Sequence, residues 1–161
     1  MSNEVNATKA NEAPTRLADG TYQPVLTVSD LDRCGRRWML GASIYNYESQ
    51  CAPAVMFATE PALRKIYAGD EEGYRRSLLS TYRYYNATPQ VSGLLLGAGL
   101  ALEDKGHNDA IDAVQDLKIG LMGSLSGVGD TIFAILIPTI FGSIAAYMGQ
   151  AGNPVGVLLW L

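Results

Sequence analysis

Charge is almost absent from the last quarter of this 161-residue chain. Ile119 to Leu161 holds a single charged side chain, Asp130, and all 12 Lys and Arg lie at or before Lys118. Soluble domains carry about 25% charged residues, so this deficit argues against an ordinary soluble surface there. A polar first part followed by an uncharged end is typical of a membrane protein with a water-facing portion. The alternative is a small soluble helical domain in which the apolar end of the chain forms the core.

Cysteine and histidine are also scarce. Cys34 and Cys51 are the only cysteines, and their spacing matches neither a metal-binding knuckle nor a redox motif. They are expected to be free, partly buried thiols. The single histidine, His107, lies in a polar segment without a Cys or His partner, so no Ser-His-Asp set can be built and a surface position is favoured. We therefore expect no metal, no cofactor and no catalytic residue.

Nucleic-acid and nucleotide binding are both disfavoured. The net charge is −4, and no basic stripe with interleaved aromatics is present. The glycine-rich run at 120–130, GLMGSLSGVGD, has no lysine for a phosphate loop, and Ile132 stands where a dinucleotide fingerprint needs its third glycine. These glycines are expected to permit tight turns and close helix contacts.

The beginning of the chain is predicted to be a disordered tail. Residues 1–25 contain acids, no apolar core and no cleavage-site pattern, so they do not form a secretory signal. A first helix is predicted from about Thr27, with Leu31, Cys34 and Trp38 on one face. Arginines occupy much of its other face. Such an amphipathic helix can lie along a membrane surface or pack against its own protein, and the sequence leaves both open.

The middle of the chain alternates broken apolar and polar segments. Residues 41–59 are nearly uncharged but too interrupted for a plain span, so a re-entrant or interrupted helix is expected. Glu60-Pro61 is interpreted as a helix start, and Asp70 as the cap of the next helix. Residues 91–102 are too short to cross a bilayer and are predicted to form a half-span or a packing helix. Residues 103–118 are predicted to be a solvent-exposed loop and helix.

The best transmembrane candidate is Ile132 to Met148, at the short edge of the spanning range. Pro138 is expected to kink it, and Thr139 or Ser143 can satisfy freed backbone groups. Val155 to Leu161 opens another apolar segment, and from this the chain is expected to be incomplete at its C-terminus.

Polar side chains occur at the breaks beside these apolar segments, where transporters usually build substrate sites. Amide, hydroxyl and carboxylate groups suit sugar hydroxyls, although backbone capping at the same breaks explains some of them. Asp130 can cap the helix that follows it or accept hydrogen bonds from a polar substrate. The candidate substrate-binding residues are Asn46, Glu48, Gln50, Asn86, Thr88 and Asp130.

An ordered series of motifs carries a family resemblance. These motifs are N-Y-E at 46–48, P-A-L-R-K-I-Y at 61–67, Y-Y-N-A-T-P at 84–89, L-A-L-E-D at 100–104 and K-I-G-L-M-G-S-L-S-G-V-G-D at 118–130. From about Leu26 to its end, the chain resembles the IID component of the mannose/fructose/sorbose family of the bacterial sugar phosphotransferase system. The glycine-rich string with its aspartate is the most specific part.

The resemblance implies an integral, multi-pass subunit of the bacterial inner membrane that pairs with a IIC subunit and helps to form the path of a hexose-type sugar. IIA and IIB components supply the phosphoryl group, which the IID subunit itself does not carry, and IIC–IID pairs are expected to oligomerise. We expect an all-α membrane protein with broken or re-entrant helices and an amphipathic N-terminal portion, with residues 26–161 as one membrane domain. At residues 49–51 and 84–88 the sequence departs from the residues that are usual in the family. These departures keep a second interpretation open, in which the chain is a non-transporting scaffold or receptor that only binds a IIC-like partner.

Overall fold

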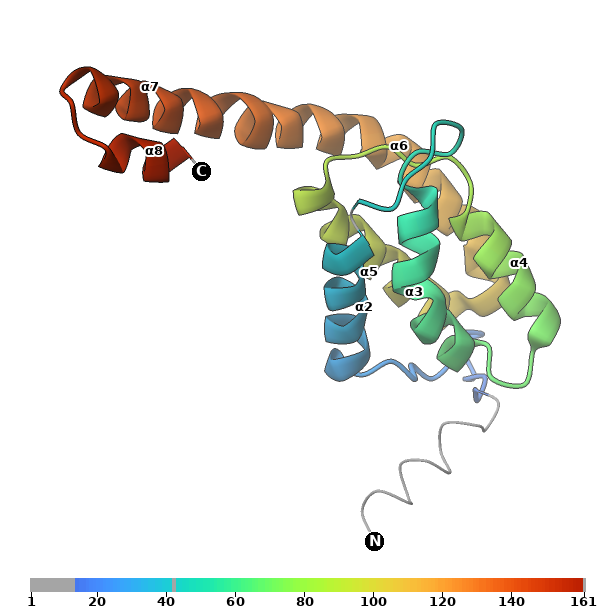
Figure 1. The fold of residues 1–161 in the computed structure, drawn as a ribbon. Helices are drawn as coiled ribbons and strands as arrows, with labels where there is room; N and C mark the ends of the chain where they lie inside the picture. The colour runs from blue at the N-terminus through green and yellow to red at the C-terminus, as the bar shows by residue number, and fades with distance from the viewer. Residues whose placement is uncertain (1–13, 42, 161) are drawn as a thin grey trace, which may run out of the picture.

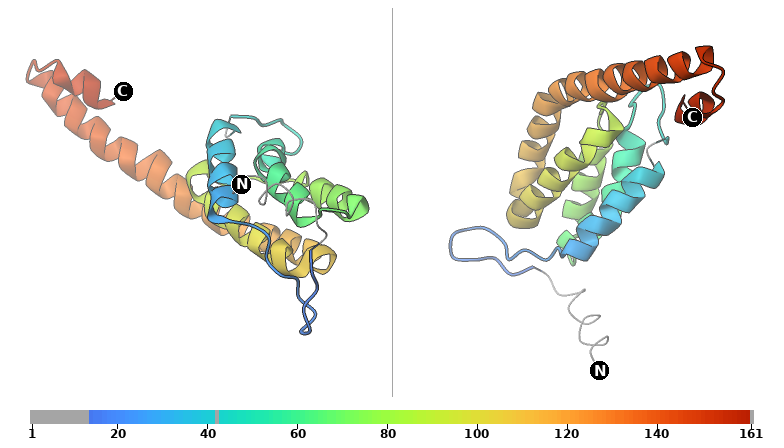
Figure 2. Two further views of the ribbon diagram at one scale, coloured as in Figure 1. Left: turned by 90° about the horizontal axis from the view of Figure 1, so that it is seen from below. Right: turned by 90° about the vertical axis from the view of Figure 1, so that its left-hand side faces the viewer.

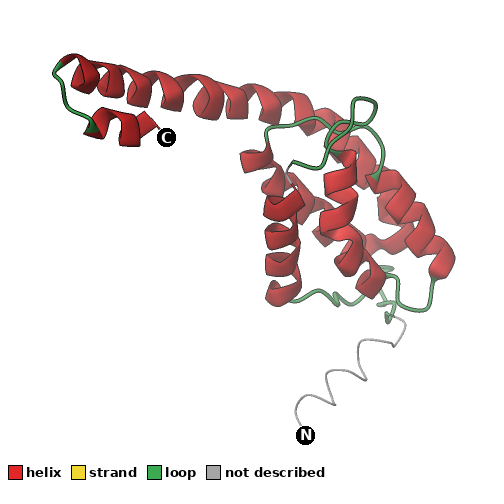
Figure 3. Cartoon of the chain, in the orientation of Figure 1, coloured by secondary structure: helices red, strands yellow, loops and turns green. Residues whose placement is uncertain are grey.

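The protein is a helical bundle from which one long helical arm projects (Figure 1). The computed structural model describes residues 14–41 and 43–160, and within these ranges regular structure is helical, with only isolated β-bridges (Figure 3). The elements are α2 (Val28–Gly41), α3 (Ala52–Ile66), α4 (Glu71–Thr81), α5 (Pro89–Gly106), a 3-10 turn (His107–Ala110), α6 (Ile111–Gly129), a π-helical stretch (Asp130–Leu136), α7 (Ile137–Gln150) and α8 (Val155–Trp160).

Helix α3 supplies much of the bundle core. Its small side chains, among them Ala54 and Ala58, are fully buried and let the neighbouring helices approach closely. The predicted helix start at Glu60-Pro61 is wrong, because Pro61 lies inside α3 and Pro53 occupies its first turn. A proline removes the bond to the carbonyl four residues earlier. That carbonyl, Phe57 O, instead accepts a hydrogen bond from Arg37 Nε at 2.7 Å.

Helix α2 packs on the bundle through two of the three residues of the face predicted from the sequence, whereas the third, Leu31, is 42% exposed. Cys34 and Trp38 are buried, and the indole Nε1 of Trp38 donates to the Pro89 carbonyl at 2.8 Å. This bond also satisfies the polar atom of an aromatic side chain that would be costly to bury unpaired. The packing interpretation of this helix is therefore confirmed for one face, while its opposite face remains exposed.

Residues 14–26 form a strap against the corner where α5 meets α6. The Tyr22 amide donates to the Lys105 carbonyl at 2.8 Å, and the amides of Val25 and Leu26 donate to the Asp104 carboxylate at 2.9 and 3.1 Å. The sequence assigned residues 14–25 to a disordered tail, but the hydrogen bonds of this strap hold them against the bundle. The remainder of that tail, residues 1–13, lies outside the described residues.

The segment 103–118 was predicted to be solvent-exposed, and the structure contradicts this for one face of the segment, although Lys105, Asp109, Asp112 and Asp116 are exposed. Glu103, Asp104, His107, Gln115 and Lys118 are each at most 5% exposed. Their partners come from α3, α4 and the strap, which are distant in the sequence. A polar helix face is ordinarily solvated, but here it lies inside the bundle, where Glu103, Asp104 and Lys118 are hydrogen-bonded to other protein groups.

The arm continues α6 without a break (Figure 2). The glycine-rich run therefore forms helix rather than the expected tight turns. The π-helical stretch comes just before Pro138, and Ile137 donates to Ile132, five residues earlier. A π-helical turn of this kind accommodates Pro138, which has no backbone N–H to donate to the carbonyl four residues earlier. Ser143 Oγ donates to the Thr139 carbonyl at 2.6 Å, which is local side-chain bonding of the kind expected there.

The arm has the length and composition of a membrane span. Among the described residues, one helical stretch is long and apolar enough to cross a bilayer; its apolar window has a mean hydropathy of 1.9 and none of that window is buried in the protein. The π-helical stretch and α7 contain 7 and 14 residues. Together they rise about 31 Å, close to the thickness of a hydrocarbon core of about 30 Å.

Helix α8 folds back along α7 by close backbone approach. A Cβ added to Gly142 would lie 2.7 Å from the Trp160 ring, and one added to Gly156 would lie 2.7 Å from the Ala145 carbonyl. Gly152, with φ of +73°, forms the turn between the two helices. Glycines at such contacts are how helices approach closely in membranes.

Candidate functional site

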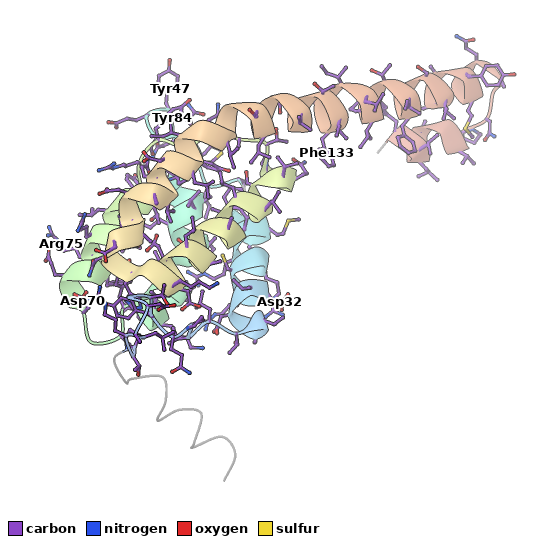
Figure 4. The ribbon with its side chains drawn as sticks, turned by 180° about the vertical axis from the view of Figure 1, so that it is seen from behind. Asp32, Tyr47, Asp70, Arg75, Tyr84 and Phe133 are labelled. Atoms are coloured by element: carbon purple, nitrogen blue, oxygen red, sulfur yellow. The ribbon has the colours of Figure 1, made fainter. Side chains whose placement is uncertain are left out.

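Two loops form the end of the bundle nearest the arm. Residues 43–51 connect α2 to α3, and residues 82–88 connect α4 to α5. The Cys51 amide donates to the Tyr85 carbonyl at 2.8 Å, and the Tyr85 amide donates to the Ser49 carbonyl at 3.3 Å. Figure 4 shows Tyr47 and Tyr84 projecting near each other from this end. The structure therefore brings together two of the three chain segments predicted to bear the site.

Within the first loop, Asn46 and Gln50 hold the backbone. The Asn46 amide oxygen accepts from the backbone N–H and the hydroxyl of Ser49 at 2.7 and 3.0 Å, and its Nδ2 donates to the Tyr82 hydroxyl at 3.4 Å. Gln50 has φ of +55° and donates from Nε2 to the Tyr47 carbonyl at 3.1 Å. Both side chains are thus engaged within the loops, which is the capping role that the sequence analysis had weighed.

Glu48 and Asn86 differ from these two residues. Both are exposed, and within 14–41 and 43–160 neither side chain makes a hydrogen bond. One carboxylate and one amide are therefore available to a ligand at the loop end.

Asp130, in the third of these segments, contacts the second loop through Thr88. The Thr88 hydroxyl lies 2.7 Å from Asp130 Oδ1 and 3.2 Å from the Ser126 carbonyl, and it can donate to either. The Ser126 hydroxyl lies 3.4 Å from Asp130 Oδ2. We call Thr88, Ser126, Gly129 and Asp130 the clasp. It joins the start of α5 to the first residue of the π-helical stretch, across 42 positions of sequence.

The prediction that Asp130 caps a helix is wrong. Asp130 follows α6 directly and has helical backbone angles, φ −64° and ψ −38°, so no helix begins there and no backbone N–H awaits a cap. Its carboxylate instead accepts side-chain hydroxyls. The first residue of the apolar stretch thus keeps its charge hydrogen-bonded at one end of the span rather than in the middle of it.

Gly129 makes the clasp possible. A Cβ at this position would lie 2.4 to 2.8 Å from the side-chain atoms of Thr88, which is closer than real Cβ contacts allow. The expectation of close helix contact in the glycine run is confirmed here. Gly120, Gly123 and Gly127 have open space where a Cβ would stand.

A network of buried polar contacts holds α4 against α5 and α6. Glu103 Oε2 accepts from the Tyr67 hydroxyl at 3.0 Å and from the Ser77 hydroxyl. Lys118 donates from Nζ to the Thr81 carbonyl at 3.2 Å, at the end of α4. These two residues belong to the L-A-L-E-D and K-I-G motifs. The network explains in structural terms why acidic and basic residues stand at those positions.

The ammonium of Lys118 also lies 5.6 Å from the centroid of the Tyr85 ring, directly under the second loop. Sequence reasoning missed this support, because a lysine in a polar stretch gives no sign of burial. The only available signal was its place beside the glycine-rich run.

His107 was predicted to lie on the surface, and the structure places it in the interior. Its ring stacks on Tyr22 of the strap with centroids 3.8 Å apart and meets the edge of Tyr67 at 5.3 Å. It occupies the corner between α5 and α6, at the end of the bundle opposite the two loops.

The arrangement offers hydrogen-bonding groups rather than reactive ones. Among the described residues, no group of three His, Cys, Asp or Glu is placed to hold a metal ion. Cys34 and Cys51 are free thiols, and burial raises the pKa of the Cys51 thiol, which disfavours the thiolate form that acts as a nucleophile. The loop end is thus suited to binding a polar molecule.

Comparison with known proteins assigns the family. The sequence profile of the PTS system mannose/fructose/sorbose family IID component matches residues 25–161. The chain belongs to this family. It is 34% identical over 143 residues to the mannose-specific EIID component of the PTS system of Escherichia coli (strain K12), covering 87% of this chain and 50% of that relative. The fructose permease IID component of Bacillus subtilis (strain 168) is 31% identical over 126 residues, covering 76% of this chain and 45% of the relative.

Solved structures agree with this assignment. The fold is similar to a chain in the cryo-EM structure of the mannose transporter ManYZ in complex with microcin E492, with a TM-score of 0.75 and 32% identity over 86% of this chain and 52% of that one. A second structure, described as a membrane protein, gives a TM-score of 0.71 and 33% identity over 84% of this chain and 51% of that one. The chain spans about half the length of the relatives it matches. It is a membrane-associated, all-α IID family member, as the motifs indicated.

Proposed function

We propose that this chain is a membrane subunit of a sugar permease of the phosphotransferase system and that, with a IIC subunit, it forms part of the path of a hexose-type sugar. One observation carries the proposal. The two polar loops are tied by the Thr88–Asp130 contact of 2.7 Å to the first residue of the apolar span. Hydrogen-bonding groups therefore lie where a solute would meet the membrane-crossing part of the protein, as in other transporters.

The six candidate residues divide into two roles in this proposal. Glu48 and Asn86 are exposed and available, so they contact sugar hydroxyls. Asn46, Gln50 and Thr88 are engaged with the protein and fix the shape of the loop end. The Asp130 carboxylate accepts a hydrogen bond from Thr88. Because an ionised carboxylate offers about four lone-pair sites, it can also accept a hydrogen bond from a sugar hydroxyl.

Partners complete the assembly. A IIC subunit pairs with this chain, soluble IIA and IIB components deliver the phosphoryl group, and IIC–IID pairs oligomerise in a multi-pass complex of the bacterial inner membrane. The basic residues at 33–37, 64–65 and 75–83 favour the cytoplasmic side for the bundle by the positive-inside tendency. The structural similarity to a chain of the ManYZ complex supports this proposal.

A binding experiment on the purified complex tests it. The chain is co-expressed with its IIC partner, and the affinity for mannose, fructose and sorbose is measured by calorimetry. Asn86→Ala and Glu48→Gln each remove one available polar group and should weaken binding by about 1–3 kcal/mol. Glu71→Gln, at an exposed acid in the first turn of α4, is the matched control and should have no effect.

Two outcomes contradict the proposal in different ways. If both loop variants bind sugar as the unmodified complex does, these residues are not sugar contacts. If the chain co-purifies with IIC but no tested sugar binds, the complex is the non-transporting scaffold that the departures at 49–51 and 84–88 suggest.

A further inference from the structure

A groove lies between α2 and the N-terminal end of α5, apart from the two loops. Its volume is about 580 Å³, within the range of about 300–1,000 Å³ that is usual for small-molecule sites. Asp32 and Arg36 contribute charge on its α2 side, and the remaining lining is mostly apolar. Besides those two, the lining residues are Gly35, Trp38, Met39, Leu40, Pro89, Gln90 and Gly93.

The exposed face of α2 continues this groove as an apolar stripe. Val28, Leu31, Gly35 and Met39 follow one another at spacings of three, four and four, which places them on one face of a helix. Val28 is 84% exposed and Met39 is 73% exposed. Helix α2 packs on the bundle through Cys34 and Trp38, which lie beside this stripe, and within the described residues the stripe itself is left exposed.

The groove is continuous with the start of the membrane span. Pro89 lines the groove, and the residue before it, Thr88, binds Asp130, the first residue of the π-helical stretch. Figure 1 shows α2 as the bundle helix on the side toward which the arm projects. A bilayer that surrounds the arm therefore meets the bundle at α2 and at the mouth of this groove.

We propose that the groove binds a bilayer phospholipid, with an acyl chain along Trp38, Met39 and Gly93 and an anionic headgroup phosphate on Arg36. The Arg36–Asp32 pair is 3.0 Å long, and its two side chains are 69% and 60% exposed, so the pair is weak. A guanidinium has five N–H donors and can bind a phosphate while keeping a carboxylate. Arg33 is also exposed on α2 and adds positive charge near the headgroups.

This lipid site is independent of sugar transport, and its test needs no sugar. The chain has two tryptophans, and Trp160→Phe leaves Trp38, in the wall of the groove, as the only one. The protein is reconstituted into phosphatidylcholine vesicles with a minor share of phosphatidylglycerol, and the acyl chains of one lipid at a time carry bromine, which quenches indole emission on contact. The expected result is quenching of Trp38 by both lipids, with a preference of roughly fivefold for brominated phosphatidylglycerol.

Two variants with matched controls separate the groove from the general membrane surface. Arg36→Gln should bring the ratio of quenching by brominated phosphatidylglycerol to quenching by brominated phosphatidylcholine toward one. Arg75→Gln, at an exposed arginine on α4, should leave this ratio unchanged. Gly35→Leu should fill the groove and reduce quenching by both lipids, because a Cβ there enters open space and the variant can fold. Gly123→Leu, at an equally open glycine on α6, should leave quenching unchanged.

A Trp38→Phe variant keeps Trp160, which lies in α8 against Gly142 of α7, and therefore reports insertion of the span. If Trp160 is quenched by brominated lipids and Trp38 is not, the arm is in the bilayer but no lipid enters the groove, and the inference is wrong. Quenching of Trp38 that is equal for the two lipids and unaffected by Arg36→Gln would overturn the assignment of the phosphate to Arg36.

Discussion

Gly129→Ala tests the clasp that joins the bundle to the span. The added methyl group would lie 2.4 Å from Thr88 Cβ and 2.5 Å from Thr88 Oγ1. Thr88 is β-branched and buried at 8% exposure, so it cannot rotate away freely. Overpacking of this kind costs about 1–3 kcal/mol. The gain in helix propensity from glycine to alanine offsets about 1 kcal/mol, which leaves an expected net loss of about 0–2 kcal/mol.

The matched control is Gly127→Ala on the same helix. Its Cβ would enter open space, so this variant should gain up to about 1 kcal/mol from propensity alone. Because the propensity gain is common to both, the two alanine variants should differ by the overpacking cost alone, about 1–3 kcal/mol in the free energy of unfolding. Thermal unfolding followed by circular dichroism in detergent micelles measures this, since each kcal/mol shifts the midpoint by about 2–4 °C for a chain of this size.

A second change identifies the cause. Thr88→Gly removes every Thr88 atom that the new methyl group would meet, so in that background Gly129→Ala should no longer destabilise. Equal melting temperatures for Gly129→Ala and Gly127→Ala would refute the close contact between Gly129 and Thr88.

Three further predictions concern the bundle. The pKa of Asp70 is lowered by the Gly73 amide and the Asn108 side chain, so its stabilising contribution is fully present above its unfolded value of about 3.9 and is lost as the pH falls through its lower value in the folded protein; Asp70→Ala should cost about 1 kcal/mol near neutral pH and progressively less as the pH is lowered below about 3.9. Glu103→Gln should cost about 1–3 kcal/mol in chemical unfolding, because two buried hydroxyls lose a carboxylate acceptor; Glu72→Gln at an exposed position is its control. Trp38→Phe should cost about 1–3 kcal/mol by removing the hydrogen bond from the buried indole to the Pro89 carbonyl, and an unchanged melting curve would contradict the bond.

The sequence predicted those features of the fold that depend on local chemistry. Asp70 caps α4, with its side chain accepting from the Gly73 amide at 2.8 Å, as its position before two glutamates indicated. The uncharged run after Asp130 forms the exposed apolar helix that was expected from its composition. Local rules sufficed in both cases, because the interacting residues are neighbours in the chain.

The errors arise where the partner is distant in the sequence. Pro61 is tolerated inside α3 because the carbonyl that proline frees, that of Phe57, is bound by Arg37, which lies 20 positions before Phe57. Glu103 is buried because Tyr67 and Ser77, 36 and 26 positions earlier, donate to it. No periodicity in the sequence encodes such pairings. Polar residues in these segments were therefore assigned to the surface by their composition.

The candidate site shows the same difference between features set by neighbouring residues and features set by distant partners. Polar residues at the breaks were identified from the sequence, and the structure places those of the two loops side by side. The sequence could not show that Asn46 and Gln50 are occupied by their own loop while Glu48 and Asn86 are available. Nor could it show that Asp130, assigned to a cap, instead binds Thr88 across the bundle.

Sugar uptake is the measurement that tests the proposed function most directly. A bacterial strain without its own mannose-family permease is supplied with the IIA, IIB and IIC components, with or without this chain, and the uptake of labelled mannose, fructose and sorbose is compared. The account predicts uptake of at least one sugar only when the chain is present, and a reduced rate with Asn86→Ala. Equal uptake with and without the chain would contradict it.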